Sequence, residues 1–263
     1  MMKKLWSKSY IGLILFLLYL PIFVVILFSF NSEKMQTVFK GFSFRYYGNL
    51  FTNRYFAPYL FNTIQVAVTS AITATVLGTA AALGLSRLGR RGKKVFMNLT
   101  YIPVINPDVV TGVSLSLVFS LGAVMFGLPK GFWTVLIAHI TFGVPFVVLN
   151  VLPRIKGADK DLMNAAHDLG CNNTQAFFKV LLPEIMPGVF SGFLMAFSLS
   201  LDDYMVATFV SGPSFQTLPL KIYSEIKKPL SPEYNAFFTL VFGAVFLVLL
   251  VSNIINNKGK VKK

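Results

Sequence analysis

Three aspartates interrupt long apolar stretches of the chain: Asp108, Asp202 and Asp203. A carboxylate at the centre of a membrane-spanning helix costs about 2.5–3.5 kcal/mol, so such residues usually face a helix bundle or a water-filled cavity. There they favour cations and oppose anions. Because adjacent helical residues point roughly 100° apart, we expect one of Asp202 and Asp203 to line a path and the other to bond a neighbouring helix. Tyr204 follows them and could add a cation–π contact.

Other chemistries fit these residues less well. Asp108 follows Pro103 and Pro107 and could instead cap a helix that resumes at Val109. An intramembrane aspartyl protease is disfavoured, because adjacent aspartates on one helix are poorly placed to share a proton. The glycine-rich stretch 89–94 lacks the spacing and the Ser or Thr of a phosphate-binding loop. We therefore expect no catalytic residue and no nucleotide site in this chain, which would not be an enzyme by itself.

The elements that carry these residues are predicted to be membrane helices. The chain is 55% hydrophobic and only 13% charged, whereas soluble domains carry about 25% charged residues. Crossing the hydrocarbon takes about 20 apolar residues, and the charge-poor stretches are long enough for about six such helices. The sequence thus predicts a single all-α membrane domain over 1–263. The predicted spans are about 10–30, 59–85, 98–121, 132–152, 185–211 and 235–256.

The distribution of basic residues predicts the orientation. With both termini in the cytoplasm, the inner segments hold twice as many Lys and Arg residues as the outer ones, as the positive-inside rule requires. The net charge of +14 therefore flanks apolar segments and does not indicate nucleic-acid binding. The first apolar stretch is too long for a signal-peptide core, so we expect a retained helix. The lone Cys171 excludes an internal disulfide, and no Cys/His cluster has metal-ligand spacing.

The longest inner segment, 154–183, carries helix-capping residues and apolar residues at helical spacing, which a simple connector would not need. Asp159 can cap a helix whose apolar residues recur at helical spacing, and Gly170 can end it in a left-handed conformation. Thr174 can cap a second short helix, which Pro183 would end. The apolar faces of these helices need a partner. Either the domain's own helix ends or a groove on a separate cytoplasmic protein would serve.

This segment resembles the EAA loop of ABC importer permeases, in which Glu-Ala-Ala is followed three residues later by Gly and then by Phe and a Leu-Pro end. The residues at the corresponding positions are Asn164, Ala165, Ala166, His167, Asp168, Gly170, Phe178, Leu182 and Pro183, and the two alanines, Gly170 and the Leu182–Pro183 end match the pattern. Asn164 replaces the family's glutamate, which removes any charge pair from that position. The resemblance implies a type I ABC importer permease fold, and it implies that these residues couple the chain to a partner ATPase. ATP and Mg²⁺ would be used there, with no cofactor bound by this chain.

Further segments resemble spermidine/putrescine permeases of the PotC type, namely 199–204, 209–213, 217–224 and 231–236. This resemblance implies polyamine cargo, with Asp108, Asp202, Asp203 and Tyr204 along its path. It also implies a second homologous permease chain, an ATPase dimer, an extracytoplasmic binding protein and a place in a bacterial plasma membrane. Two alternatives stay open. The same machine could carry another cationic solute, or the chain could be an ion-coupled secondary transporter, which would need no coupling loop.

Overall fold

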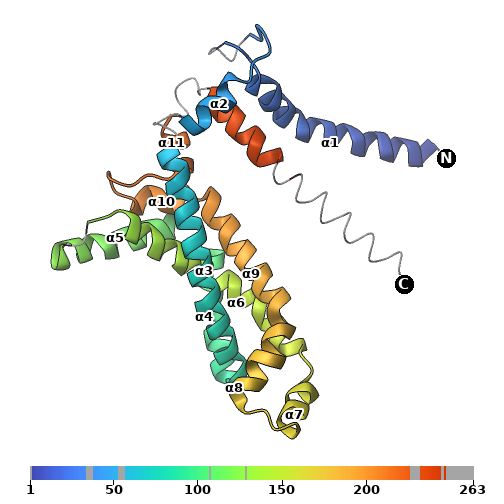
Figure 1. Cartoon of the computed structure of the whole chain (residues 1–263), viewed down its shortest axis with the longest axis vertical. Coiled ribbons are helices and arrows are strands. Elements are labelled where there is room, and N and C mark those ends of the chain that lie inside the picture. Colours follow the sequence, from blue (N-terminus) through green and yellow to red (C-terminus); the bar gives the residue numbers. More distant parts are fainter. Residues whose placement is uncertain are drawn as a thin grey trace. The chain divides into compact units, whose positions relative to one another are not determined.

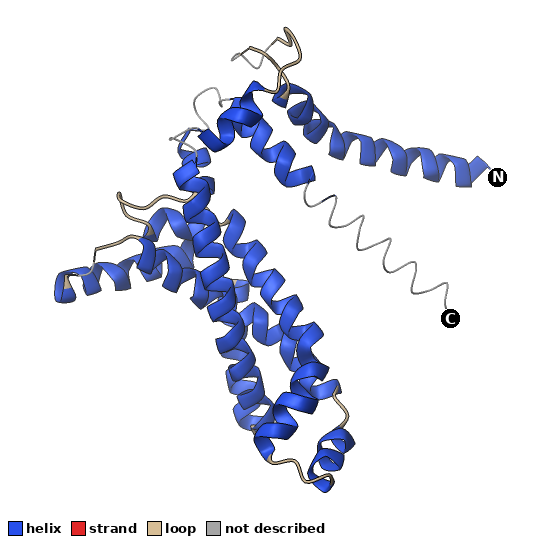
Figure 2. Cartoon of the chain, in the orientation of Figure 1, coloured by secondary structure: helices blue, strands red, loops and turns tan. Residues whose placement is uncertain are grey.

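The structure is a computed structural model, and it describes residues 2–33, 38–52, 57–106, 108–127, 129–225, 232–243 and 246. Regular structure in these ranges is helical (Figure 2), apart from an isolated antiparallel bridge between Asn31 and Phe42. The residues form two compact units, one made of Met1–Ala57 and Glu225–Lys263 and the other of Pro58–Ser224. The single domain over 1–263 stays a prediction.

The first unit begins with the long helix α1 (Met2–Ser29), which is drawn in dark blue in Figure 1. It also holds the short helix α2 (Arg45–Thr52) and a helical segment over 232–243. The end of α1 is fixed by a side-chain contact, because the Ser29 hydroxyl lies 2.7 Å from the Tyr47 hydroxyl of α2. The end of a long apolar helix is thereby tied to the short helix α2.

An aromatic cluster surrounds this contact. Phe30 stacks on Phe42 with ring centroids 4.7 Å apart, and Phe44 and Tyr47 pack around the edge of Phe30. Phe42 and Phe44 remain exposed. Aromatic side chains are enriched where the headgroup layer of a bilayer meets water, so a cluster of this kind at the end of a long apolar helix is suited to anchoring that end at the interface.

The second unit holds the remaining helices and the predicted sites. The elements in chain order are α3 (Ala57–Arg87), α4 (Arg90–Ile105), α5 (Asp108–Phe126), α6 (Phe132–Gly157), α7 (Lys160–Asp168), α8 (Asn173–Ala176), the π-helical turn η1 (Phe177–Leu181), α9 (Leu182–Asp202), α10 (Met205–Val210) and α11 (Leu218–Glu225). The helices α3, α6 and α9 run alongside one another (Figure 1) and share one apolar core.

Five stretches in the described part of the chain are long and apolar enough to span a membrane. They are Tyr10–Ser29, Ala57–Arg87, Asp108–Met125, Phe132–Gly157 and Asn173–Asp202. The predicted sixth span, 235–256, lies largely outside the described residues. The count of six and the cytoplasmic placement of both termini therefore stay predictions.

Two predicted spans are not continuous helices. The stretch 98–121 is divided between α4 and α5, because the backbone turns extended at Asn106 with ψ at 139°. The residue before a proline disfavours the helical conformation, and Pro107 follows Asn106 in the sequence. The stretch 185–211 is divided between α9 and α10 by an extended Asp203.

Small residues let α3, α6 and α9 approach closely. A Cβ at Gly78 of α3 would lie 2.6 Å from the Val147 Cβ of α6, and one at Gly192 of α9 would lie 3.1 Å from the Val147 Cα. Gly143 of α6 faces Ala74 of α3 in the same way. Without a hydrophobic driving force between helices in lipid, such close contact is a main source of association.

The Gly78→Ala substitution is expected to destabilise the protein by about 1–3 kcal/mol, because the added methyl group overlaps a buried valine at its branch point. Gly84 lies on the same helix, and a Cβ there would meet nothing within 4 Å. The matched Gly84→Ala variant should therefore be neutral or stabilised by up to about 1 kcal/mol. Thermal unfolding of the purified chain in detergent measures both, and equal midpoints would contradict this account of the core.

Candidate functional site

The chain leaves the helical conformation at Asp203, between α9 and α10. Asp203 has an extended backbone (φ −64°, ψ 122°), and Tyr204 (φ −121°, ψ −33°) precedes the first turn of α10. Non-helical backbone within a membrane-spanning region is tolerated where it is buried in protein or lines a water-filled cavity, because its polar groups need partners. The backbone amides and carbonyls at this helix break therefore need hydrogen-bond partners from the protein.

The Asp203 carboxylate supplies the partners for the start of α10. Its Oδ1 accepts from the Val206 amide at 3.2 Å, and its Oδ2 accepts from the Ala207 amide at 2.9 Å. The side chain is only 8% exposed, and His139 Nε2 of α6 lies 3.2 Å from Oδ2. That last contact has the distance of an ion pair but lacks the alignment of a hydrogen bond. Asp203 thus caps one helix and contacts another.

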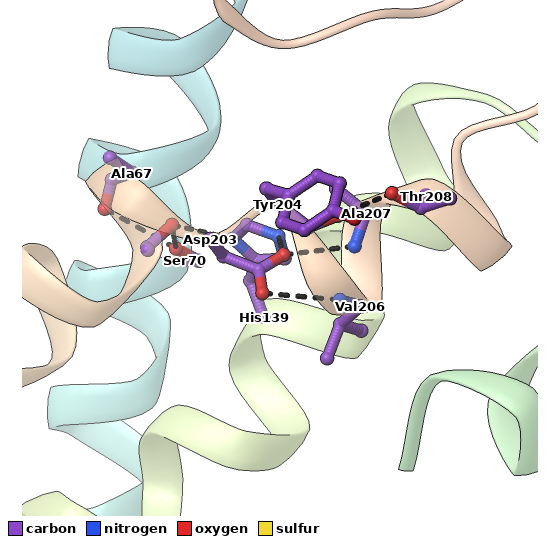
Figure 3. A network of polar contacts seen from close by, with 9 residues as sticks. Ala67, Ser70, His139, Asp203, Tyr204, Val206, Ala207 and Thr208 are labelled. Carbon is purple, nitrogen blue, oxygen red and sulfur yellow. Dashed lines mark hydrogen bonds and ion pairs between the residues drawn. The ribbon is translucent and has the colours of Figure 1, made fainter. Parts of the chain in front are cut away.

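A chain of polar contacts continues from His139 across the bundle (Figure 3). His139 Nδ1 lies 2.6 Å from the Ser200 hydroxyl of α9, and the Ser70 hydroxyl of α3 donates to Ser200 at 3.1 Å. The Ser200 hydroxyl thus contacts a side chain on each of the two neighbouring helices, Ser70 of α3 and His139 of α6. The network joins α3, α6, α9 and α10, and it gives the buried His139 a hydrogen-bond partner inside the bundle.

Asp202 differs from its neighbour. It is the last residue of α9 and is exposed, whereas the side chain of Asp203 is nearly buried. Of the two aspartates, Asp203 is therefore the one whose carboxylate contacts a neighbouring helix, α6, while it accepts hydrogen bonds from α10. The role of Asp202 as the path-lining member stays a prediction, as does that of Asp108, which is the exposed first residue of α5.

Tyr204 contacts a residue that the sequence does not single out for chemistry. Its ring stacks on that of Tyr223 in α11, with centroids 3.6 Å apart and planes inclined by 6°. The two tyrosines are far apart in the sequence, and α11 is a short helix with no charge or glycine pattern that points to the contact. His139 is also not assigned to the path, but the sequence does mark it, because it is a polar residue within an apolar span.

The loop after α6 forms the predicted helix and turn. The Asp159 carboxylate accepts from the Asp161 amide at 2.9 Å and so caps α7. Gly170 has a positive φ of 84°, and the Cys171 amide donates to the Ala166 carbonyl at 3.0 Å across this turn. This bond gives a carbonyl in the last turn of α7 a partner, as in a Schellman motif. The predicted cap and left-handed stop are confirmed.

The second helix of the loop differs from the prediction in two respects. Its cap is Asn172, which exchanges hydrogen bonds with Gln175 at 2.8 and 3.1 Å, and not Thr174. Nor does the helix end at Pro183, since helical backbone continues from Asn173 to Asp202. The wider π turn η1 ends at Leu181, two residues before Pro183, whose nitrogen has no N–H to donate to the helix.

The family-like positions of the loop are mostly exposed. Ala166 is buried, while Asn164, Ala165, His167, Asp168, Gly170 and Pro183 are exposed and Leu182 is half-buried. Among the apolar side chains, Phe178 is 59% exposed and Leu169, next to Gly170, is 86% exposed. The domain's own helix ends therefore leave much of this apolar surface uncovered, which favours the second of the two partners considered above, a groove on another protein.

Comparison with known proteins defines the class. Residues 74–257 match the family described as binding-protein-dependent transport system inner membrane component. The chain belongs to this family of ABC importer permeases and is a multi-pass membrane protein.

Individual relatives are similar over most of the chain. It is 41% identical over 234 residues to the putrescine transport system permease protein PotI of Escherichia coli (strain K12), covering 88% of this chain and 83% of that protein. It is 37% identical over 268 residues to the spermidine/putrescine transport system permease protein PotC of the same strain, covering all of both chains. A PotC homolog of Mycoplasma genitalium is 29% identical, with 95% and 88% covered.

Solved structures agree on the fold. A chain of the bacterial alginate ABC transporter, in complex with its alginate pentasaccharide-bound periplasmic protein, superposes with a TM-score of 0.70 at 16% identity. The match covers 94% of this chain and 91% of that chain. A second alginate transporter structure gives a TM-score of 0.68 at 17% identity, covering 97% and 96%. These similarities support the predicted all-α importer permease fold.

The Asp203→Ala substitution is expected to lower the free energy of unfolding by about 1–3 kcal/mol, because α10 loses its cap and buried His139 loses its charged neighbour. The adjacent Asp202→Ala change removes the same chemical group from an exposed position and should cost within about 0.5 kcal/mol. Thermal unfolding in detergent compares the two variants. A larger loss in Asp202→Ala would mean that the structural roles of the two aspartates are reversed.

Proposed function

We propose that this chain is the permease subunit of an ATP-driven polyamine importer, and that it forms the translocation path for spermidine and putrescine. The observation that carries the proposal is the similarity to PotC and PotI at 37% and 41% identity over nearly the whole chain. The chain would work by alternating access in a bacterial plasma membrane, with both termini in the cytoplasm and a partner ATPase driving the change.

The helix break supports cationic cargo. The carbonyl end of α9 carries the negative end of the helix dipole, and the exposed carboxylate of Asp202 adds a full negative charge there. Asp203 contributes less to the field in the path, because two amides and His139 surround its carboxylate. A polyamine presents separated ammonium groups that such a site attracts and an anion does not. Asp108 and Tyr204 complete the proposed path.

The exposed apolar residues of the loop support the proposal that a separate protein supplies the energy for transport. The Leu169 and Phe178 side chains are suited to a groove on a partner ATPase, with the remaining residues from Asn164 to Pro183 shaping the contact. The full machine would contain a second homologous permease chain, an ATPase dimer that uses ATP and Mg²⁺, and an extracytoplasmic polyamine-binding protein. This chain would bind no cofactor itself.

The nearest alternative keeps the same machine and changes the cargo to another cationic solute, since one carboxylate does not distinguish among cations. An ion-coupled secondary transporter is not favoured, because the chain belongs to a binding-protein-dependent family.

Uptake assays with Asp202→Asn test the cargo and the path together. We expect uptake of radiolabelled spermidine or putrescine by the wild-type transporter, and a loss of about ten- to hundred-fold in the variant, because a charge-assisted contact contributes about 1.5–3 kcal/mol. The control is Glu33→Gln, a partly exposed acid in the first unit that pairs with Lys40. Absence of polyamine uptake by the wild type would contradict the cargo, and unchanged uptake by Asp202→Asn would contradict the path.

The Leu169→Glu substitution tests the loop. It places a charge at the centre of the proposed apolar contact, so we expect less ATPase to co-purify with the permease and uptake to fall at least tenfold, by analogy with an interface contact worth about 2 kcal/mol. The control Leu88→Glu changes a less exposed leucine between α3 and α4. ATPase association and uptake equal to the wild type in Leu169→Glu would show that the loop is not the docking surface.

A further inference from the structure

The stacked tyrosines offer a second kind of recognition at the helix break. Tyr204 lies in the break itself, two residues after Asp202, and Tyr223 lies on α11. Half of the surface of Tyr223 is exposed, while Tyr204 is half-buried. An aromatic pair that begins two residues after an exposed carboxylate offers the two groups that attract an alkylammonium ion, a negative charge and an electron-rich ring face.

The two rings are held from independent anchors. Asp203 fixes the start of α10 beside Tyr204 through its bonds to Val206 and Ala207. The segment before Tyr223 is fixed to α3, because the Leu218 amide donates to the Thr63 hydroxyl at 2.7 Å and the Asn62 side chain donates to the Gln216 carbonyl at 3.0 Å. The stack is thus built into the fold, and a ligand would pay little ordering entropy to use it.

The face-to-face geometry of the two tyrosine rings is suited to a bound cation. Aromatic rings prefer offset or edge-on arrangements because their quadrupoles repel face to face, yet this pair lies nearly parallel with centroids 3.6 Å apart. A cation over an outer face would offset that repulsion. Other aromatic pairs of this unit lie farther apart, as Phe132 and Phe215 do at 5.5 Å in an edge-on arrangement.

We propose that the Tyr204–Tyr223 stack is an ammonium-binding platform that holds one charged group of the cargo while Asp202 neutralises it. The inference rests on the proposed function and adds Tyr223 to the path as a residue that determines specificity. The platform selects alkylammonium groups over anions and over small, strongly hydrated metal cations, which lose more hydration at a ring face.

The experiment measures spermidine uptake by the complete transporter in liposomes, with its partner subunits present and the binding protein saturating. Tyr223→Leu is expected to reduce the initial rate about three- to thirty-fold, the range that cation–π contacts span between exposed and desolvated sites. Tyr223→Phe keeps the ring face and should stay within about threefold of the wild type. The control Phe190→Leu removes an exposed aromatic ring elsewhere on α9 and should leave uptake unchanged.

A fluorinated series separates ring electrons from packing. Phenylalanines with increasing fluorine content at position 223 keep the shape of the ring while withdrawing the negative charge from its face. Uptake should fall stepwise along this series, and the thermal midpoint of each variant in detergent shows that it is folded. Equal uptake along the series, or equal loss in Tyr223→Phe and Tyr223→Leu, would overturn the platform. A wild-type transporter that takes up no polyamine would instead contradict the proposed function.

Discussion

A helix that stops inside an apolar region leaves amides and carbonyls that lipid cannot satisfy, and this constraint governs the centre of the protein. Asp203 meets it by accepting from the first amides of α10, while His139 and two serines bring the neighbouring helices to the same point. The break is therefore an ordered feature with defined partners. Because Asp203 is committed to this role, its exposed neighbour Asp202 is left to present charge at the end of α9.

The close contact of α3, α6 and α9 gives this arrangement its precision. Val147 lies against both Gly78 and Gly192, so the three backbones meet at one buried side chain. The Ser70–Ser200–His139 contacts belong to the same three helices. Hydrogen bonds between membrane helices contribute modestly, and close packing supplies much of the association. The packing of the apolar core thus positions the residues of the polar network, and both require glycine at positions 78 and 192, where a larger side chain would push the helices apart.

Much of the helical architecture follows from the sequence, because apolar length and sparse charge have few other solutions. The cap at Asp159 and the left-handed Gly170 also follow from local chemistry. The break at Asp203 does not, since the acidic pair marks a polar point in an apolar stretch without showing that the backbone leaves the helical conformation there, and part of its stabilisation comes from a tertiary partner, His139. The Tyr204–Tyr223 stack escapes prediction for the same reason, because it joins residues whose proximity depends on how α11 returns to α3.

The π turn at Phe177–Leu181 has a mechanical consequence. It allows helical backbone to pass Pro183 without interruption, so one stretch of 30 residues connects the loop at Asn173 to the break at Asp202. At the rise of an α-helix this is a rod of about 45 Å. The stretch contains the π turn near its Asn173 end and one further proline, Pro187, within α9. Because the helical stretch that begins in the loop also carries Asp202, a tilt of this stretch would move that carboxylate directly.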